Sequence, residues 1–475
     1  MSKFYLTTSI AYVNAPPHIG YALELTQADV IARWRRQQGD DVFFLTGTDE
    51  HGAKIARAAA EAGKTPRQLV DENAARFQAL KDILNISWDD FIQTSDQKRH
   101  WPNVIEVWQK LAGAGDIYKK NYQGLYCVGH EAFVTEKDLE NGLCRDHQTK
   151  PEIIEEENYF FRLSKYAPLV AERIKSGQLK IVPQHRANEI LSFISQGVED
   201  ISFSRPRKDL QWGIPVPGDE TQTIYVWADA LTNYLYPKDR WPADVHFIGK
   251  DILRFHALYW PAMLLSAGLS LPKTIFVHGF IMVEGKKMSK SLGNVIDPVE
   301  LVNKYGADAV RYYLLREIPA VDDGDFSIKK FEERYNADLA NGLGNFSARV
   351  LALAGIDANI RINANDMNKY ANTKIVVEQK LSQFKFNEAL AAIWDLIASG
   401  DKFINDNKLW ETKDQQKIGE VLAILDAVAD LIQPFLPATA EKISAQGGSP
   451  PEADAPREHA SGGKAHQKTQ LFPRI

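Results

Sequence analysis

The stretch FYLTTSI at residues 4–10 is rich in β-forming side chains, and the PP pair at residues 16–17 separates it from a run with helical periodicity between Tyr21 and Arg36. A second strand-like run, DVFFL, follows at residues 41–45. Two strands separated by a helix of this length predict a βαβ unit with a right-handed crossover and a parallel sheet. We therefore expect an α/β fold that begins as nucleotide-binding sheets do.

The residues after this unit predict an insertion, a second half of the sheet and a helical region. From about Tyr118 to Arg205 the chain changes to hairpin-like runs that contain both cysteines. We expect the sheet to resume at IYVW, residues 224–227, and again at VHFIG, residues 245–249. After Asp325 the pattern is helical, and Pro434 stops a late helix. One apolar stripe at helical spacing consists of Phe386, Leu390, Ile393, Ile397 and Ile404.

The composition is that of a chain that forms a core. Of the 475 residues, 44% are hydrophobic and 25% are charged, which excludes a disordered or fibrous protein. At roughly 100–200 residues per domain, the length favours about three domains. A net charge of -6 argues against a surface wholly coated for nucleic acid, although a local basic groove remains compatible with it.

The sequence carries no sign of a membrane span or a secretion signal. No window offers the ~20 apolar residues that a spanning helix needs, so we expect a cytoplasmic protein with no membrane partner. Two cysteines in so long a chain cannot form a disulfide scaffold, and a reducing compartment would keep them free or metal-bound. Residues 445–470 contain no Leu, Ile, Val, Met or aromatic side chain, so we expect a flexible loop or tail there.

Two short motifs are suited to phosphate chemistry. PHIG, residues 17–20, stands where a strand ends and a helix begins, so that backbone N–H groups favour phosphate and Gly20 lets a flat adenine approach. GKKMSKSLG, residues 285–293, places three lysines between glycines, where they can meet charge that grows on the β- and γ-phosphates. Either motif alone is more often a chance turn or a solvated lysine run. In this order they are the paired signatures of the class I aminoacyl-tRNA synthetases, which the chain resembles.

Six ordered stretches narrow the resemblance to the methionyl-tRNA synthetase family of that class. The resemblance runs from about Lys3 to the closing LFPRI, residues 471–475. It implies a Rossmann-like parallel-sheet catalytic domain that is split by an insertion and followed by an all-α anticodon-binding bundle. The six stretches are YVNAPPHIG (12–20), TGTDEHG (46–52), NYFFR (158–162), YVWADA (225–230), GKDILRFH (249–256) and FVHG (276–279).

The resemblance also implies a reaction and a set of residues for ATP. Methionine and ATP, bound with Mg²⁺, would give methionyl-adenylate and pyrophosphate, and the methionyl group would then pass to the 3′ end of tRNA(Met). His18 would bind the phosphates in the transition state, and Lys287 and Lys290 would hold the leaving pyrophosphate. The residues implied for the ribose and adenine side are Gly20, Glu24, Gly249, Asp251 and Ile281.

A methionine pocket is implied by the same stretches. Asp49 would pair with the ammonium group of the amino acid, and Arg205 would lie near the carboxylate and phosphate side. Aromatic side chains suit a polarizable thioether, although without the resemblance core packing would be the better interpretation of the aromatic residues here. The remaining pocket residues are Ile10, Tyr12, Trp227, Ala230, Leu231, Tyr234 and His256.

Tyr21 departs from the family pattern, which usually has a second histidine there. His18 and Tyr21 are three residues apart on the first helical turn, so both can face one ligand. A phenol can donate one hydrogen bond to a phosphate but cannot become cationic near neutral pH. We therefore expect a working catalytic site with weaker charge stabilisation.

A metal site is predicted in the insertion. Cys127 and His130 form one C-x2-H pair and Cys144 and His147 form a second, and four N/S ligands from two tight turns suit tetrahedral Zn²⁺. Relatives with one zinc knuckle here usually carry more cysteine, so His130 is a substitution. Two turns without a metal are the alternative.

The helical region contains the residues implied for anticodon recognition. Asn345 and Arg349 lie four apart on one helix face, and Trp410 follows Leu409, which stands where relatives usually have proline. The resemblance implies that these residues read the CAU anticodon, with the tryptophan stacking on a base. Because no appended domain follows Ile475 of the kind that some relatives use to dimerise, we expect a monomer.

We expect five segments in the chain. Residues 1–117 and 206–280 would form the two halves of the catalytic domain, 118–205 the insertion with the zinc knuckle, and 281–330 the lysine loop with a tRNA stem contact. Residues 331–475 would form the helical anticodon domain, with 445–470 flexible.

Two alternatives remain open. Another class I synthetase, for leucine, isoleucine or valine, would carry a large editing domain where this chain has a short insertion. A catalytically silent tRNA-binding protein is the other alternative. His18, Lys287 and Lys290 argue against it, whereas Tyr21 keeps it open.

Overall fold

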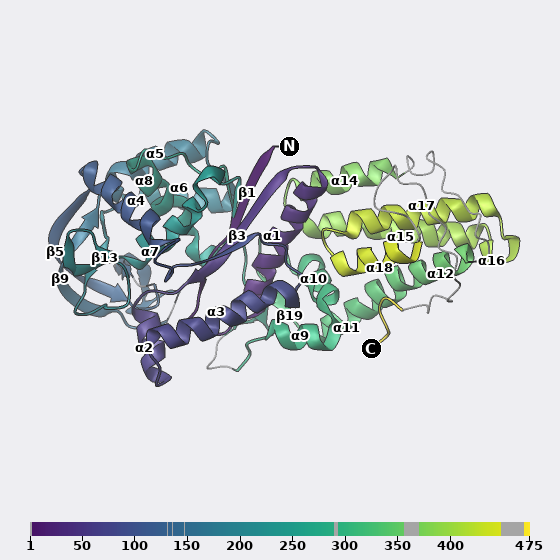
Figure 1. Ribbon diagram of the computed structural model, residues 1–475, viewed down its shortest axis with the longest axis horizontal. Helices are drawn as coiled ribbons and strands as arrows, with labels where there is room; N and C mark the ends of the chain where they lie inside the picture. The colour runs from purple at the N-terminus through teal and green to yellow at the C-terminus, as the bar shows by residue number, and fades with distance from the viewer. Residues whose placement is uncertain are drawn as a thin grey trace. The chain divides into compact units, whose positions relative to one another are not determined.

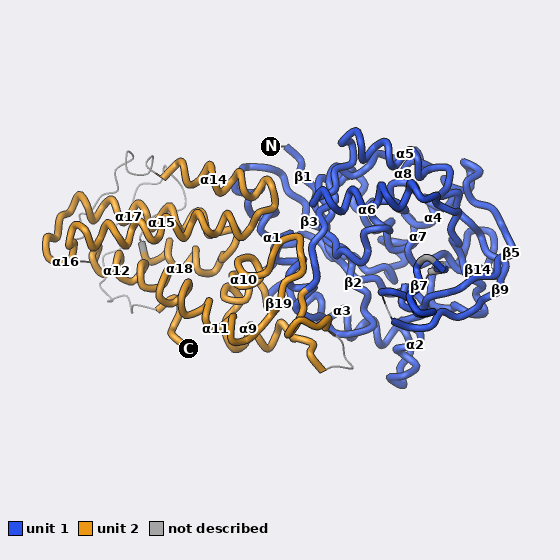
Figure 2. Tube along the Cα trace, turned by 180° about the vertical axis from the view of Figure 1, so that it is seen from behind, with its two compact units in different colours: residues 1–82, 86–280 blue, residues 83–85, 281–475 orange. Residues whose placement is uncertain are grey.

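The computed structural model describes residues 2–130, 132–134, 136–146, 148–288, 293–355, 370–447 and 470–475. The chain divides into two compact units, Met1–Asp82 with Ile86–Phe280 and Ile83–Asn85 with Ile281–Ile475 (Figure 2). Among the helices of this described chain, none combines the length and the apolar composition needed to cross a bilayer.

A seven-stranded sheet forms the centre of the first unit, and every strand pair in it is parallel. The order is β10-β16-β15-β1-β3-β2, with β4 also beside β3. The predicted parallel α/β sheet is therefore confirmed. Its strands are β1 (Lys3–Thr8), β2 (Ala11–Tyr12), β3 (Asp41–Asp49), β4 (Asp90–Gln93), β10 (Lys180–Val182), β15 (Val245–Gly249) and β16 (Thr274–His278).

Helix α1 (Ile19–Gln37) connects β1 to β3 and packs on the sheet, as Figure 1 shows. Its residues from Ala22 to Ala32 are almost all buried, including Glu24, Gln27 and Asp29, because the helix is covered on more than one side. The other helices of this unit are α2 (Ala53–Glu61), α3 (Pro66–Ile83, ending at the unit boundary), α4 (Trp101–Gly113), α5 (Leu163–Lys175), α6 (Gln184–Ser195), α7 (Val226–Ala230) and α8 (Trp260–Ser266).

The insertion is built on a long antiparallel pair, β5 (Ile117–Cys127) with β9 (Glu152–Phe161). Strands β6 (Ala132–Val134) and β11 (Ile201–Ser202) extend this pair to a four-stranded sheet. A separate two-stranded ribbon carries Cys144, and a three-stranded sheet carries Arg205. These are β7 (Leu139–Glu140) with β8 (Leu143–Cys144), and β12 (Ser204–Pro206) with β14 (Asp219–Ile224) and β13 (Pro215–Val216).

Of the two places where the sheet was expected to resume, one is confirmed and one is wrong. Residues 245–249 form β15 in the central sheet. At 224–227, by contrast, Ile224 ends β14 of the small antiparallel sheet and Val226 begins α7. The segment is apolar because it is buried, and Val226, Ala228 and Ala230 are all under 6% exposed. A short buried helix and a short buried strand cannot be distinguished by such a pattern.

The second unit combines a small sheet with a set of helices. The strands are β17 (Ile281–Val283), β18 (Lys286–Lys287) and β19 (Gly324–Phe326), in the order β18-β17-β19. The helices are α9 (Pro298–Tyr305), α10 (Ala307–Arg316), α11 (Ile328–Arg334), α12 (Asn345–Ala354), α14 (Ala371–Leu381), α15 (Phe386–Asp406), α16 (Leu409–Thr412), α17 (Gln415–Ile432) and α18 (Pro437–Gly447), with a π-helical stretch at Tyr335–Gly344 before α12.

Two predicted features of this helical unit are confirmed, the apolar stripe and the helix end before Pro434. All five residues of the apolar stripe on α15 are buried, and α17 ends at Ile432, just before Pro434. The chain is helical up to Gly447, so the expected loop is wrong for residues 445–447, which are stabilised as the last turn of α18. Residues 448–469 lie outside the described residues. Beyond them, Phe472 is buried and packs edge-on against Tyr335.

Candidate active site

The carboxyl ends of four neighbouring parallel strands define the candidate site. In the order β3-β1-β15-β16, these strands end at Asp49, Thr8, Gly249 and His278. Ser9 follows β1 directly, and its N–H donates to the carbonyl of Phe247 on β15 at 2.8 Å. Open α/β sheets bind their ligands at this edge, where helix N-termini also converge.

His18 is the N-cap residue of α1. Its Nδ1 accepts a hydrogen bond from the Gly20 N–H at 3.1 Å, so the proton of the neutral ring is on Nε2. Partial removal of water lowers the pKa of His18 below its ordinary value, and the nearby Asp251 carboxylate opposes the shift. At neutral pH the ring can therefore offer an uncharged N–H to a phosphate, next to the positive end of the helix dipole.

Tyr21 is engaged within the protein. Its hydroxyl lies 3.0 Å from Oγ1 of Thr46 on β3, and its ring packs edge-on against Phe77 at 5.0 Å between centroids. Burial raises the pKa of Tyr21 well above its usual value, with Glu24 acting in the same direction, so the phenol stays neutral. That His18 and Tyr21 face the same ligand stays a prediction.

Glu24 on α1 is buried and contacts residues at the ends of β1 and β16. Ser9 Oγ donates to its Oε1 at 2.6 Å, and Nε2 of His278 lies 2.9 Å from its Oε2. Beside this pair, a Cβ added at Gly249 would lie 2.7 Å from Oδ1 of Asp251, so glycine leaves room for that carboxylate. The structure thus brings Glu24, Gly249 and Asp251 together, and it adds His278, which the sequence showed within FVHG but did not mark as a site residue.

Part of the expected methionine pocket is a connected buried cluster. Tyr234 and His256 are each 1% exposed, and the Tyr234 hydroxyl lies 2.8 Å from His256 Nε2. Nδ1 of His256 lies 3.0 Å from the carbonyl of Ile252, which can only accept, so Nε2 is the acceptor for the phenol. Trp227 stacks on Phe255 at 3.8 Å between centroids and presents its edge to His256 at 6.1 Å.

The remaining pocket residues surround this cluster to different degrees. Leu231 is buried in the same hydrophobic core as Tyr234, and Tyr12 packs against that core from β2. Ala230 is also buried, with 3% of its surface exposed. Ile10 packs on a separate small cluster that contains Tyr5 and Leu45. Asp49 is 6% exposed at the end of β3, and Thr94 Oγ1 lies 3.5 Å from its Oδ1.

Arg205 has its described contacts within the insertion. Its Nε lies 3.1 Å from Oε1 of Glu156 on β9, and its guanidinium lies 4.0 Å from the ring centroid of Tyr126 on β5. The aromatic face and the carboxylate together stabilise the cation where it stands. The structure therefore does not show Arg205 grouped with Asp49 and the strand ends.

One buried aspartate that contacts two histidines was not predicted from the sequence. Asp229 on α7 is held by His51 Nδ1 on one oxygen and by His100 Nε2 on the other, each at 2.6 Å. Burial would raise the pKa of Asp229, but the two histidines outweigh it and keep the pKa below its usual value. The signal was present, because His51 lies in TGTDEHG and Asp229 in YVWADA, but neither stretch indicates which side chains meet.

The lysine motif lies in the second unit. Lys287 is exposed on β18, opposite Met282 of β17, and Asn294 Nδ2 donates to its carbonyl at 3.3 Å. Ile281 is buried on β17, paired with Gly324. Lys290 lies outside the described residues.

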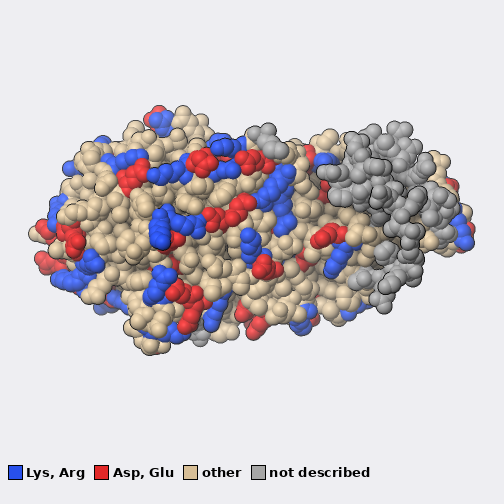
Figure 3. All heavy atoms as spheres, in the orientation of Figure 1, with Lys and Arg blue, Asp and Glu red and all other residues tan. Residues whose placement is uncertain are grey.

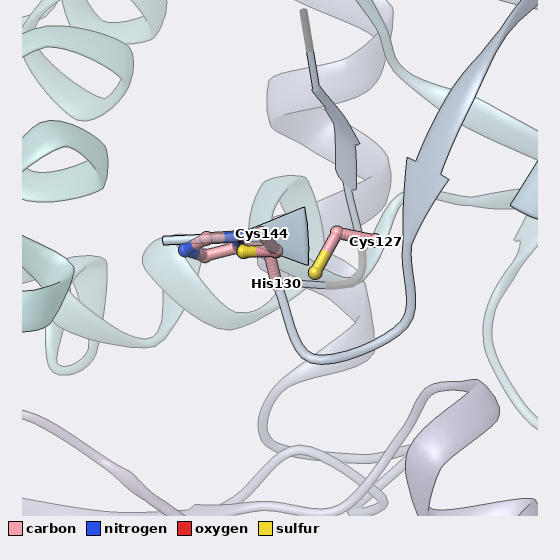
Figure 4. Close-up of side chains that lie close together, drawn as sticks. All are labelled: Cys127, His130 and Cys144. Atoms are coloured by element: carbon pink, nitrogen blue, oxygen red, sulfur yellow. Dashed lines mark hydrogen bonds between the residues drawn. The ribbon is translucent and has the colours of Figure 1, made fainter. Parts of the chain in front are cut away.

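Three of the four predicted metal ligands gather in the insertion, as Figure 4 shows. The ligand atoms of Cys127, His130 and Cys144 all lie within 4.8 Å of one another, and His130 Nδ1 lies 3.5 Å from Cys144 Sγ. The other ring nitrogen of His130 contacts Asp146 at 2.9 Å. This arrangement, with Nδ1 toward the sulfur and Nε2 on a carboxylate, is typical of a metal-binding histidine. His147 lies outside the described residues.

The anticodon candidates lie on the helical unit. Asn345 is exposed at the start of α12, and Trp410 is 49% exposed on the short helix α16. Arg349 is held by α15, since its two terminal nitrogens donate to Asp401 Oδ1 and Asn405 Oδ1 at 2.6 Å each. Leu409, next to the exposed tryptophan, is fully buried and anchors α16.

Comparison with known proteins agrees with this geometry. The family model for tRNA synthetases class I (M) matches residues 4–144 and 134–351. The methionine–tRNA ligase of Brucella suis is 43% identical over 93% of this chain and 91% of its own length, and that of Clostridium perfringens is 46% identical over 93% and 73%. The solved Mycobacterium tuberculosis methionyl-tRNA synthetase in complex with methionyl-adenylate is 41% identical, with a TM-score of 0.88 over 93% of both chains.

A parallel sheet with His18 and Gly20 at its carboxyl edge, interrupted by an insertion and followed by a lysine motif and helices, defines a class I aminoacyl-tRNA synthetase. The identities and coverage narrow this further: the chain belongs to the methionyl-tRNA synthetase family. It is an ATP-dependent methionine–tRNA ligase, as the resemblance implied, and the two alternative functions are set aside.

The buried His256 predicts a pH dependence of stability. Burial lowers the pKa of His256 to about 4, with the Ile252 carbonyl acting in the opposite direction. In the unfolded chain the histidine returns to a pKa of about 6.5, so between about pH 6.5 and pH 4 the unfolded state binds the extra proton. Stability therefore falls as pH falls through that window. His256→Gln keeps an acceptor for Tyr234 but removes this titrating group. Between pH 7 and about pH 4.5, the free energy of unfolding of the variant should therefore fall by about 2 kcal/mol less than that of the parent chain.

Urea unfolding at the two pH values measures this difference. His246 is also buried and its pKa is also lowered, mainly by burial and to a smaller extent by His256. Because His246 and its burial are common to both proteins, most of its contribution cancels. His185→Gln, at an exposed position on α6, is the matched control and should lose as much stability as the parent chain. An equal loss in the His256→Gln protein would contradict the prediction.

Proposed function

We propose that the edge formed by the ends of β3, β1, β15 and β16 holds methionine and ATP side by side. The methionine carboxylate would attack the α-phosphorus, and pyrophosphate would leave. The methionyl group would then pass from the adenylate to the terminal adenosine of tRNA(Met). Because the nucleophile belongs to the substrate, the protein contributes positioning and electrostatic stabilisation. The observation that carries this proposal is the convergence of His18, Glu24, Gly249 and Asp251 at one sheet edge.

The phosphate side rests on His18 at the N-terminus of α1. Its Nε2–H group would donate a hydrogen bond to the phosphates of Mg²⁺-bound ATP. This hydrogen bond would be strongest when negative charge has built up on the leaving group. Lys287, which is exposed on β18, and Lys290 would add positive charge to the pyrophosphate. Glu24 and Asp251 would hold the ribose, and Ile281 would line the adenine.

The methionine side rests on the cluster around Tyr234 and His256. His256 accepts a hydrogen bond from Tyr234 and donates one to the Ile252 carbonyl. These two bonds fix one neutral tautomer of His256, and its lowered pKa leaves the ring uncharged. An uncharged, aromatic pocket suits a thioether, which gains from sulfur–aromatic contact. Asp49 at the end of β3 would pair with the ammonium group. The described contacts of Arg205 do not support a role for it in this step.

Replacement of His18 tests the phosphate role. His18→Asn keeps a good helix N-cap but places no donor where Nε2 stands, whereas His18→Gln keeps a donor near that position. We predict that His18→Asn lowers kcat of methionine-dependent ATP–pyrophosphate exchange about 100- to 1,000-fold with little change in KM for methionine. His18→Gln should be less affected.

The parent enzyme gives the reference in the same assay. It should exchange with methionine and not with leucine, isoleucine or valine. Equal rates for the Asn and Gln variants would show that the Nε2 donor is not what His18 contributes. Exchange with another amino acid at the methionine rate would contradict the proposed pocket.

Zinc is the cofactor that fits the insertion cluster. Two thiolates and an imidazole are ligands that Zn²⁺ prefers, and the Asp146 contact would orient the imidazole. His147 is the fourth ligand that the sequence spacing supplies. The Trp227 indole N–H donates to the carbonyl of His130 at 3.4 Å, so the metal would also hold a loop beside the methionine pocket.

We predict about one zinc per chain in enzyme purified without chelator, measured by elemental analysis. Cys144→Ser should abolish stable binding, because it removes a buried thiolate ligand. Asp146→Asn, which leaves all ligands in place, should weaken zinc about 10- to 100-fold in chelator competition. Parent enzyme without zinc would refute the site.

The helical unit is proposed to read the tRNA(Met) anticodon. The exposed face of Trp410 supports base stacking, and the fixed fork of Arg349 supports hydrogen bonding to a base. On the face shown in Figure 3, basic and acidic side chains of the described residues are interspersed. The five expected segments are proposed to have the roles given above, in a monomer working in the cytoplasm, where Cys127 and Cys144, which form no disulfide, would stay reduced.

Trp410→Ala tests this interface. Loss of one stacked base should raise KM for tRNA(Met) in aminoacylation about tenfold while pyrophosphate exchange stays unchanged. Ile375→Ala is the matched control, because Ile375 is a large apolar side chain that is 60% exposed on α14 of the same unit. Equal effects of the two variants, or none from Trp410→Ala, would contradict the proposal.

A further inference from the structure

His278 at the end of β16 has hydrogen-bond acceptors at both ring nitrogens. Nδ1 lies 2.8 Å from the carbonyl oxygen of Gly279, and Nε2 lies 2.9 Å from Oε2 of Glu24. The side chains of both residues are under 9% exposed, so water does not compete for these contacts. A carbonyl oxygen cannot donate, so Nδ1 must carry a proton.

The second contact requires one more proton. A neutral histidine with its proton on Nδ1 would place the lone pair of Nε2 against a carboxylate oxygen, and two acceptors at 2.9 Å repel each other. The contact is favourable only when a proton lies between Nε2 and Oε2. The pair therefore holds one proton more than a neutral imidazole and a free carboxylate would, and it is electrically neutral as a whole.

The position of this pair connects it to the ATP side of the site. Ser9 Oγ occupies one lone pair of the Glu24 Oε1, so each carboxylate oxygen has one protein partner and one lone pair left for a ribose hydroxyl. A Cβ added at Gly249 would lie 3.7 Å from His278 Cε1 and 2.7 Å from Asp251 Oδ1, which places both the histidine and the second carboxylate next to that glycine.

We propose that His278 is a positioning residue of the ATP site: protonated against Glu24, it orients that carboxylate toward the ribose and offsets the negative charge of Glu24 and Asp251 near the triphosphate. The inference rests on the proposed ribose role of Glu24. Without the proton, Glu24 would lose one of its two orienting hydrogen bonds, and two carboxylates would face a polyanionic substrate. ATP binding would weaken, whereas the methionine side would be unaffected.

The charge environment gives the direction of the pH effect. The titratable groups that act on His278 are Glu24 on α1 and Asp251 on the turn after β15. Burial would lower the pKa of His278, but the Glu24 hydrogen bond and charge, the Gly279 carbonyl and Asp251 outweigh it, and the pKa is raised above 6.5. The proton is therefore kept to a higher pH than on an ordinary histidine and is lost as pH rises through the raised pKa. The pKa of His18 is lowered, so that ring loses its proton at a lower pH than His278 does.

Two isosteric substitutions test the inference. His278→Gln places an uncharged N–H donor near the Nε2 position, toward Glu24, whereas His278→Asn keeps a donor only near the Nδ1 position, toward Gly279. KM for ATP and KM for methionine are measured by pyrophosphate exchange from about pH 6 to about pH 9, a range that brackets a raised histidine pKa. We expect KM for ATP of the parent enzyme to rise with pH, with KM for methionine unchanged.

The variants should separate orientation from charge. His278→Asn should raise KM for ATP about tenfold at neutral pH, the expected effect of losing a hydrogen bond to a charged group. His278→Gln should raise it less and should remove the alkaline rise. A role in packing alone would change both Michaelis constants in both variants. An alkaline rise that persists in His278→Gln, or no rise in the parent enzyme, would overturn the inference, and the second result does not depend on any variant folding.

The role of Glu24 is tested separately with nucleotide analogues. Parent enzyme and Glu24→Gln are compared with ATP, 2′-deoxy-ATP and 3′-deoxy-ATP. If Glu24 holds the ribose, the parent enzyme should prefer ATP over at least one analogue and Glu24→Gln should lose that preference. A preference that survives Glu24→Gln would refute the ribose role, whatever the His278 variants show. A loss of preference together with a pH-independent parent enzyme would refute only the role of His278.

Discussion

The parallel pairing of β1 with β3 on one side and β15 on the other is the constraint on which the catalytic unit depends. Leu6 stands opposite Phe44 in one pairing and opposite Val245 in the other, so the register joins segments about two hundred residues apart. Parallel strands end at the same edge, and that edge receives Ser9, Asp49 and Gly249 together. A slip of one residue would turn every side chain of β1 to the opposite face and separate these groups.

Two buried carboxylates of this unit are compensated by histidines. Glu24 is paired with His278, and Asp229 is held between His51 and His100. A buried carboxylate without such partners would cost several kcal/mol, whereas a hydrogen-bonded pair retains its geometry and presents a defined face to a ligand. In one case the paired carboxylate lies at the sheet edge that is proposed to bind ATP, and in the other it fixes α7, which carries Trp227.

The differences between expectation and structure have a common physical origin. Residues 224–227 are apolar because they are buried, and burial alone does not distinguish a strand end from the start of α7. The assignment of Tyr21 and Arg205 to a ligand stays a prediction from the resemblance; their described partners are Thr46 in one case and Glu156 with Tyr126 in the other. His278 and Asp229 were not predicted as site residues, because the sequence of a motif does not indicate whether its histidine or aspartate contacts substrate or another side chain.

The sequence by itself determined the parallel sheet with its split, the family, and the ligand-type residues Cys127, His130 and Cys144, because strand periodicity, motif order and cysteine spacing are properties of local chain segments. Only the tertiary structure decided which of these residues meet. The contact of His278 with Glu24 joins two residues 254 positions apart, and that of His100 with Asp229 joins two 129 apart. Such contacts depend on strand order and register, which are set by burial of the whole sheet rather than by any stretch within it.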